Sequence, residues 1–364
     1  MLEQFRRLGA GLSTITERWV PDAWVICMML TAVAMVLCVV GAGASVEETV
    51  LAWGQGVWNL LGLAMQFTIA MVAAHACVAS RPVYRLFNWL ASLPNPARPV
   101  QALLLAGVFS LVMGYLNWAV CLVSCALFTP FVLKRNPNVD VRLLICASYL
   151  GLGTVWHGGL SGSAPLILAT PGNPLMDPAS GTAVVDRLYP VTETLYNGFN
   201  VVFLFIIGGV ALLATCLLHP KSGARTLSPE QAEAIMPQPP AEDAPPRTPA
   251  EFIDQFRGWI VLAVVLLAYP LGHSIVTRGF GTSWTINANN ITFLVLALML
   301  HGRAPSFLRA CRQGVDSAWG IIVQFPFYAG IFGLLQRTDL GAWLGDLFAN
   351  VASQATYPWV VYIY

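Results

Sequence analysis

Charged residues are scarce in this sequence of 364 residues, and their scarcity excludes an ordinary soluble domain. Asp, Glu, Lys and Arg make up only 10% of the chain, whereas a soluble domain has roughly 25%. The net charge is +1, so an excess of cations that would attract nucleic acid is also missing. Hydrophobic residues account for 57% of the sequence. We therefore expect an all-α polytopic membrane protein.

Cysteine and histidine spacings that bind metal are absent as well. The chain has eight cysteines but no C-x-x-C pair and no Cys/His ligand spacing, so we predict no metal site and no cofactor other than a coupling ion. Most of the cysteines lie in apolar runs, where free buried thiols are the ordinary outcome.

Long uncharged apolar runs predict membrane helices, because about 20 residues span a bilayer core. These runs lie near residues 23–43, 57–80, 196–219, 258–276, 286–302 and 314–336. A further run, 142–156, leads directly into a stretch rich in glycine and proline, and together they predict a broken helix over 142–170. We expect no acidic residue at membrane depth.

Residues 100–133 form an apolar run that is too long for one simple crossing and has Asn117 at its centre. The positive-inside rule decides how it folds. Sixteen of the nineteen Lys and Arg residues lie in alternate flanks of the spans, at 1–22, 81–99, 134–142, 220–257 and 303–312. A cytoplasmic N-terminus reproduces this pattern only if 100–133 begins and ends inside. The run is therefore predicted to be a re-entrant hairpin that turns at Asn117.

We predict that the chain divides into two related halves, with a chance likeness between apolar helices as the alternative. Residues 220–250 are rich in proline and read as a cytoplasmic linker between a first repeat, 1–219, and a second repeat, 251–364. Residues 55–92 align with 313–350, and the charge pattern gives the aligned helices opposite directions, as in inverted-repeat transporters. The alignment pairs Gln66 with Gln324. These two side chains either join helices by hydrogen bonds or contribute to binding.

The stretch "HGGLSGSAPLILATPGNP" at 157–174 is unusually rich in glycine and hydroxyl side chains for a membrane chain. Lipid cannot hydrogen-bond exposed amides, so irregular backbone at membrane depth survives only where it lines a protein cavity. Pro165 suits the first turn of a new half-helix, which Ser161 or Ser163 would cap. The free N–H groups at that end would attract a carboxylate.

Other readings of the same residues stay open. The stretch is alternatively an external loop, in which Thr170 and Asn173 form a turn rather than coordinate Na⁺. Asn117 either satisfies freed backbone groups or contacts ligand. His157 is a candidate proton relay, although it lies close to the end of a span. Gln66, Thr170, Asn173 and His157 are therefore the candidates for ion or proton coupling.

Several motifs together resemble the bacterial short-chain fatty acid (acetoacetate/butyrate) transporter family. They are "WGQGVWNLL", "GLSGSAPL", "ATPGNP", "NGFN" and "VQFPFYAGI". The similarity extends from about residue 10 to the end, and it implies the fold of the wider ion-transporter superfamily of carboxylate carriers: two inverted repeats with re-entrant hairpins. It also implies ion-coupled uptake, or symport, of short monocarboxylates across the inner membrane. Carried over by motif, the substrate-binding positions are Asn117, Ser161, Gly162, Ser163 and Gln324.

Members of that family continue beyond Tyr364, so the second repeat is expected to be truncated, with an incomplete hairpin arm at 355–364. A non-transporting fragment is the alternative function. A membrane-embedded hydrolase is a weaker alternative, because Ser161 and Ser163 lie near His157 but no acid is close enough in sequence to orient the histidine. Na⁺ is favoured over H⁺ as coupling ion, since hydroxyls and carbonyls suffice to bind it. The expected partners are the substrate and the lipid bilayer, with a homo-oligomer left open and no nucleic acid.

Overall fold

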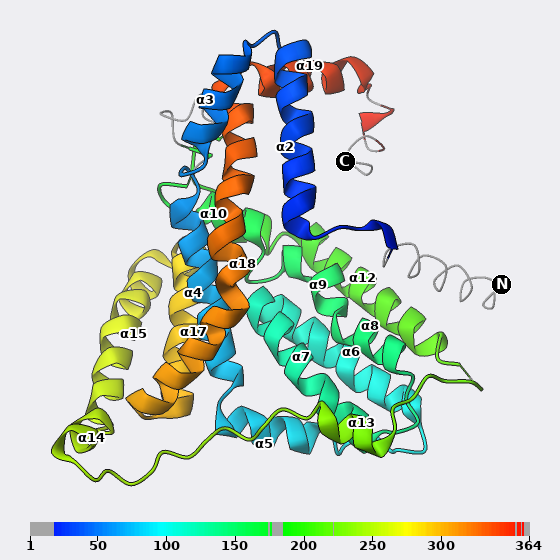
Figure 1. Ribbon diagram of the computed structural model, residues 1–364, viewed down its shortest axis with the longest axis vertical. Coiled ribbons are helices and arrows are strands. Elements are labelled where there is room, and N and C mark those ends of the chain that lie inside the picture. The colour runs from blue at the N-terminus through cyan, green and yellow to red at the C-terminus, as the bar shows by residue number, and fades with distance from the viewer. Residues whose placement is uncertain are drawn as a thin grey trace. The chain divides into compact units, whose positions relative to one another are not determined.

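A computed structural model describes residues 18–173, 175–176, 185–220, 222–353, 355–357 and 359. Within this part of the chain the secondary structure is helical and contains no strand, and seven helices are long and apolar enough to cross a membrane. The prediction of an all-α polytopic membrane protein is confirmed. The chain forms two compact units, Met1–Met65 with Pro174–Asp186 and Trp319–Tyr364, and Gln66–Asn173 with Arg187–Ala318 (Figure 1). Of the predicted hairpin arm at 355–364, residues 358 and 360–364 lie outside the described residues.

The first unit contains helices α2 (Ala23–Val40), α3 (Val46–Gly56) and α19 (Leu340–Val351), and the second half of α18 (Ala304–Arg337). α2 lies within the range 23–43 predicted for a helix. The helix α3 was not predicted. It begins with a capping box in which the Ser45 hydroxyl accepts from the Glu48 N–H, and the Glu48 carboxylate accepts from the Ser45 N–H.

Small residues bring α3 and α18 into close contact in this unit. A Cβ atom on Gly56 would lie 2.5 Å from the Cα of Gly333 and 2.8 Å from the carbonyl oxygen of Ala329. A Cβ on Gly333 would lie 2.7 Å from the carbonyl oxygen of Ala52. Ala52 and Gly56 are four residues apart, as are Ala329 and Gly333, which is the spacing that lets membrane helices pack backbone to backbone.

The second unit holds the larger share of the helices, including most of α4 (Leu61–Val78) and the first half of α18. The others are α5 (Arg81–Leu90), α6 (Pro99–Leu116), α7 (Trp118–Arg135), α8 (Val141–Ser148), α9 (Leu150–Thr154), η1 (Trp156–Gly158), α10 (Ser163–Ala169), α11 (Val191–Thr194), α12 (Gly198–Leu217), α13 (Pro229–Ala234), α14 (Pro249–Asp254), α15 (Gly258–Arg278), α16 (Phe280–Ser283) and α17 (Ile286–His301). The helices predicted near 57–80, 196–219, 258–276 and 286–302 correspond to α4, α12, α15 and α17.

The predicted break at Asn117 is confirmed. α6 ends at Leu116, α7 begins at Trp118, and Asn117 between them has an extended backbone. Each arm has 18 residues and is itself long enough to cross a membrane, so re-entrance stays a prediction. The range 142–170, predicted to be a broken helix, holds the short pieces α8, α9, η1 and α10, and the first interruption lies at Tyr149, inside the run 142–156.

α18 begins ten residues before the predicted start of the helix at 314–336. It is a candidate membrane span and it contains Asp316. The expectation that no acid lies at membrane depth stays a prediction, because the 34 residues of α18 exceed what a bilayer core needs and Asp316 lies in the first half of the helix. The residues that follow α18 form helix α19, which the sequence pattern did not indicate.

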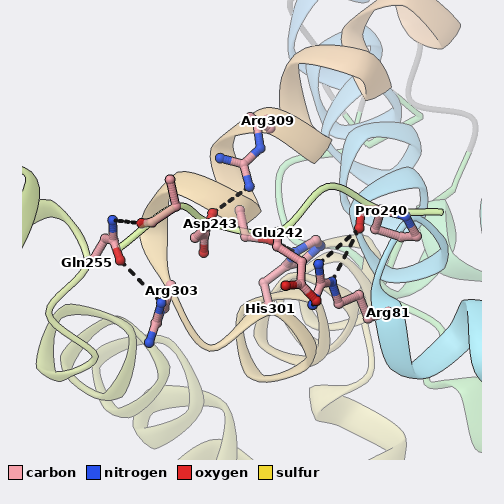
Figure 2. Close-up of polar contacts among 10 residues, drawn as sticks. Arg81, Pro240, Glu242, Asp243, Gln255, His301, Arg303 and Arg309 are labelled. Carbon is pink, nitrogen blue, oxygen red and sulfur yellow. Dashed lines mark hydrogen bonds and ion pairs between the residues drawn. The ribbon is translucent and has the colours of Figure 1, made fainter. Parts of the chain in front are cut away.

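The proline-rich linker makes specific contacts at Pro240–Ala244, which we call the linker strap. Arg81, the first residue of α5, forms an ion pair with Glu242. Arg309, near the start of α18, forms another with Asp243, whose side chain is 11% exposed. Figure 2 shows both arginines reaching the strap from opposite sides. The linker strap therefore connects the start of α5 with the start of α18 through two ion pairs.

Candidate functional site

The candidate site begins at the tip between α6 and α7, in the second unit. The side chain of Asn117 is 1% exposed. Its carbonyl oxygen accepts from the Val120 N–H at 2.9 Å and so caps α7, while its amide nitrogen donates to the carbonyl oxygen of the Asn289 side chain at 2.6 Å. Asn117 therefore satisfies backbone at the break, which is one of the two roles considered for it, while contact with a ligand stays a prediction.

The irregular backbone after η1 packs against the same tip. The Leu160 N–H donates to the carbonyl oxygen of Tyr115 at 2.7 Å, and the Ser161 hydroxyl accepts from the Trp118 N–H at 2.7 Å. The prediction that Ser161 or Ser163 caps the following half-helix is wrong. Gly162 is the N-cap of α10 and makes no side-chain capping bond, and Ser163 is the first residue of that helix.

The glycines of this stretch serve close approach rather than unusual backbone angles. None of Gly158, Gly159 and Gly162 has a positive φ. A Cβ on Gly159 would lie 2.5 Å from the carbonyl oxygen of Tyr115 on α6. Gly158 lies against Asn200, whose amide donates to the Gly158 carbonyl oxygen at 3.1 Å. The stretch needs glycine because neighbouring atoms, backbone at Gly159 and Gly162 and side chain at Gly158, occupy the space of a Cβ.

The start of α17 completes the site with residues that the sequence reasoning missed. Asn289 is buried, accepts from Asn117, and donates to the Leu160 carbonyl oxygen at 3.3 Å. Trp284 donates its indole N–H to the same carbonyl at 2.8 Å. The available signal was the motif "INANN", which places three asparagines in the first turns of an otherwise apolar helix.

Two of the predicted coupling residues also reach this start of α17. The side chain of Gln66 donates to the side-chain oxygen of Asn287 at 2.9 Å. The backbone carbonyl oxygen of Gln66 accepts from the side-chain amide of Asn290. The Thr170 hydroxyl accepts from the Ile286 N–H at 3.3 Å. We call this assembly the polar junction; it consists of Gln66, Asn117, Leu160, Ser161, Thr170, Asn287, Asn289 and Asn290.

The remaining predicted residues lie apart from the polar junction or in the other unit. His157 is exposed, and its ring lies 4.1 Å from that of Trp156. Asn173 donates to the Thr170 carbonyl oxygen in a turn. Gln324 belongs to the first unit, where it accepts from the Tyr328 hydroxyl at 3.0 Å.

The polar junction can bind an anion but has no catalytic arrangement. Leu160 contributes its backbone carbonyl oxygen, and the other members contribute neutral amides and hydroxyls. The polar junction therefore offers N–H and O–H donors without a fixed positive charge. The Ser161 hydroxyl is 2% exposed and is held by a backbone N–H, while His157 is exposed, so the two do not form a nucleophile and base pair. Among the described residues, no group of three or more His, Cys, Asp or Glu could hold a metal ion.

Helices interrupted around buried polar groups, within an apolar bundle of spans, define the class of the molecule as a polytopic membrane transport protein. The family described as short chain fatty acid transporter matches residues 4–364. The chain belongs to this family and is a transport protein rather than an enzyme. The resemblance seen in the motifs is confirmed, and the hydrolase alternative is excluded.

Individual relatives agree with the family. A protein of Escherichia coli (strain K12) named "Putative short-chain fatty acid transporter" is 34% identical over 356 residues, which cover 97% of this chain and 77% of that protein. A protein of the same name from Haemophilus influenzae (strain ATCC 51907 / DSM 11121 / KW20 / Rd) is 30% identical over 357 residues, covering 97% and 78% of the two chains. No solved structure matches.

Proposed function

We propose that the chain carries short monocarboxylates, such as butyrate and acetoacetate, across the cytoplasmic membrane, and that the carboxylate binds at the polar junction. Family membership supports the substrate class. The observation that supports the proposed position of the carboxylate is the buried Asn117–Asn289 hydrogen bond, which joins the tip between α6 and α7 to the start of α17. Neutral donors suit a singly charged carboxylate, whereas phosphate or a dicarboxylate would call for Arg or Lys.

Binding would proceed by exchange of hydrogen bonds. In the structure the Asn117 amide nitrogen donates to Asn289, and the Asn289 amide nitrogen donates to the Leu160 carbonyl oxygen. A substrate carboxylate between the two amides would accept both N–H groups and replace neutral acceptors by a charged one. Hydrogen bonds to a charged group are worth about 1.5–3 kcal/mol, roughly twice a neutral bond. The exchange therefore favours the ionised acid.

Transport is proposed to be coupled to Na⁺ or H⁺. The carbonyl oxygens of Leu160, Ser161 and Thr170 each accept a side-chain N–H that a bound Na⁺ would displace. This arrangement of unwound carbonyls near broken helices supports Na⁺. Proton coupling would instead use His157 or the carboxyl group of the substrate.

Alternating access through two inverted repeats is part of the proposal, with the N-terminus in the cytoplasm. In the sequence alignment of 55–92 with 313–350, the residues of α5 correspond to those of α19, and the residues of α4 correspond to the end of α18. The glycine contacts follow the same alignment. Gly56 meets Gly333 in one unit, and the aligned Gly314 meets His75 in the other, where a Cβ on Gly314 would lie 3.2 Å from the His75 Cβ. His75 aligns with Gly333, so both contacts use equivalent positions.

Uptake of radiolabelled butyrate into proteoliposomes tests the proposal, with a Na⁺ gradient, a pH gradient or neither. Asn289→Ala is expected to lower kcat/KM roughly 10- to 150-fold, the equivalent of one hydrogen bond to a charged group. Thr292→Val is the matched control on α17, because the Thr292 hydroxyl donates to the Ala288 carbonyl oxygen of its own helix. Equal effects of the two variants would count against a carboxylate at the polar junction.

The alternative, a chain that does not transport on its own, makes a different prediction. It predicts no uptake of any short monocarboxylate by this chain under either gradient, while the Escherichia coli relative is active in the same vesicles. Preferential uptake of phosphate or citrate would instead overturn the substrate class.

A further inference from the structure

A pocket of about 510 Å³ lies away from the polar junction, between α5, the end of α7 and the chain after α13. Its polar lining consists of Tyr84, Asn88, Ser92, Lys134 and Arg135. Ala91, Phe131, Met236 and two prolines complete the walls. The pocket thus combines two cations and three hydrogen-bonding side chains with an apolar floor, and none of the described residues that line it is acidic.

The charges at the pocket leave one cation without an acidic partner. Lys134 forms an ion pair with Glu233 of α13 at 2.6 Å. Arg135 donates to the neutral side chain of Asn88 at 2.8 Å, and no carboxylate pairs with it within the described part of the chain. The pocket therefore has a surplus of one positive charge, which matches a ligand with a single negative charge.

The helix α5, which forms one wall of the pocket, has the composition of a helix that lies at a membrane surface. α5 buries Phe87 against Phe128 and Phe131, yet its outer side exposes Leu86 and Trp89. A short helix with a basic start, an exposed tryptophan and exposed leucine is typical of a segment that lies in the interface. Basic pockets beside helices at the cytoplasmic surface bind anionic lipid headgroups.

We propose that this pocket binds the phosphodiester headgroup of an anionic phospholipid of the cytoplasmic leaflet, such as phosphatidylglycerol. Arg135 and Lys134 contact the phosphate, and Tyr84, Asn88 and Ser92 lie where they can hydrogen-bond the headgroup. The acyl chains leave along the apolar side of α5. The site is separate from substrate binding, and it goes beyond the proposed transport function without depending on it.

Lipid binding to the purified chain in neutral detergent tests the proposal, with affinities for phosphatidylglycerol and phosphatidylcholine measured by native mass spectrometry. Arg135→Gln is expected to weaken phosphatidylglycerol binding about fivefold, the effect of one cation near a membrane surface. Arg135→Lys keeps the charge and most of the affinity. Arg85→Gln is the matched control, because Arg85 is exposed on α5, the helix that forms one wall of the pocket, and does not itself line the pocket.

A gain of binding separates the proposal from structural damage. Glu233→Gln removes the acid that neutralises Lys134 and is expected to strengthen phosphatidylglycerol binding about fivefold. Equal affinity for phosphatidylcholine would overturn the proposal, as would an effect of Arg85→Gln as large as that of Arg135→Gln. If inorganic phosphate or glycerol 3-phosphate bound as tightly as the lipid, the pocket would be a site for free phosphate esters and the lipid assignment would be wrong.

Discussion

A single methyl group at Gly56 is expected to destabilise the first unit, because it enters the space of the backbone of α18. The added Cβ would lie 2.5 Å from the Cα of Gly333, whereas carbon atoms in contact are about 3.5–4.0 Å apart. The two helices must therefore separate by about 1 Å or more. Overpacking of this kind costs about 1–3 kcal/mol, and the upper end applies because backbone cannot rotate away.

A second effect of the same substitution has the opposite sign. Alanine favours a helix over glycine by about 1 kcal/mol. The net loss for Gly56→Ala is then about 2 kcal/mol, or about 30-fold in the folding equilibrium. Gly54→Ala is the matched control two residues earlier in α3, because a Cβ at Gly54 has no neighbour within 4 Å. That control keeps the helix gain without the clash and should stabilise the protein.

Thermal unfolding in detergent, followed by circular dichroism, measures both variants. The midpoint should fall for Gly56→Ala and stay level or rise for Gly54→Ala. The reasoning is refuted if both midpoints move in the same direction by similar amounts. Gly333→Ala disturbs the same contact from the other helix. The losses of stability caused by Gly333→Ala and by Gly56→Ala should therefore not add in the double variant.

Two further predictions concern buried side chains. Ser161→Ala removes the acceptor of the Trp118 N–H and should cost about 1–3 kcal/mol of stability, with Ser163→Ala as the control that leaves the midpoint unchanged. Burial raises the pKa of the Asp140 carboxyl, but hydrogen bonds from the Arg225 N–H and from Arg142 outweigh burial and hold the pKa below its usual value. Because the folded-state pKa is the lower one, this stabilisation is complete above the unfolded pKa of about 4 and is lost as the pH falls through the folded value. Unfolding scans should therefore show Asp140→Asn as destabilised at pH 7 and converging with the wild type in acid; a constant difference at every pH would contradict this.

The sequence predicted the spans and the breaks because both have local causes. Apolar runs determine where α2, α12 and α15 lie, since a long uncharged segment has few alternatives in lipid. The break at Asn117 followed from a run too long for one helix combined with the basic residues at its two ends. α3 was missed although its capping box is a local signal, because Ser45 and Glu48 lie between two of the apolar runs, where only the runs were used to predict helices.

The contacts of the candidate site could not be predicted in the same way, because they join distant parts of the chain. Asn117 and Asn289 are 172 residues apart, and no periodicity relates them. Ser161 was expected to cap the helix that follows it, but its hydroxyl accepts from Trp118, 43 residues away. Which of several nearby donors a hydroxyl meets is decided by packing, and sequence spacing contains no information about it.

The linker strap also implies an order of events during synthesis. Arg81 and Glu242 are 161 residues apart, so at about 5–20 residues per second Arg81 waits roughly 8 to 30 s for its partner to be made. Asp243 precedes Arg309 by 66 residues, which adds roughly 3 to 13 s. The helices of the first half must therefore insert and hold their positions before the strap exists. The ion pairs of the linker strap therefore form late, and the pair with Arg309 forms only after the start of α18 has been synthesised.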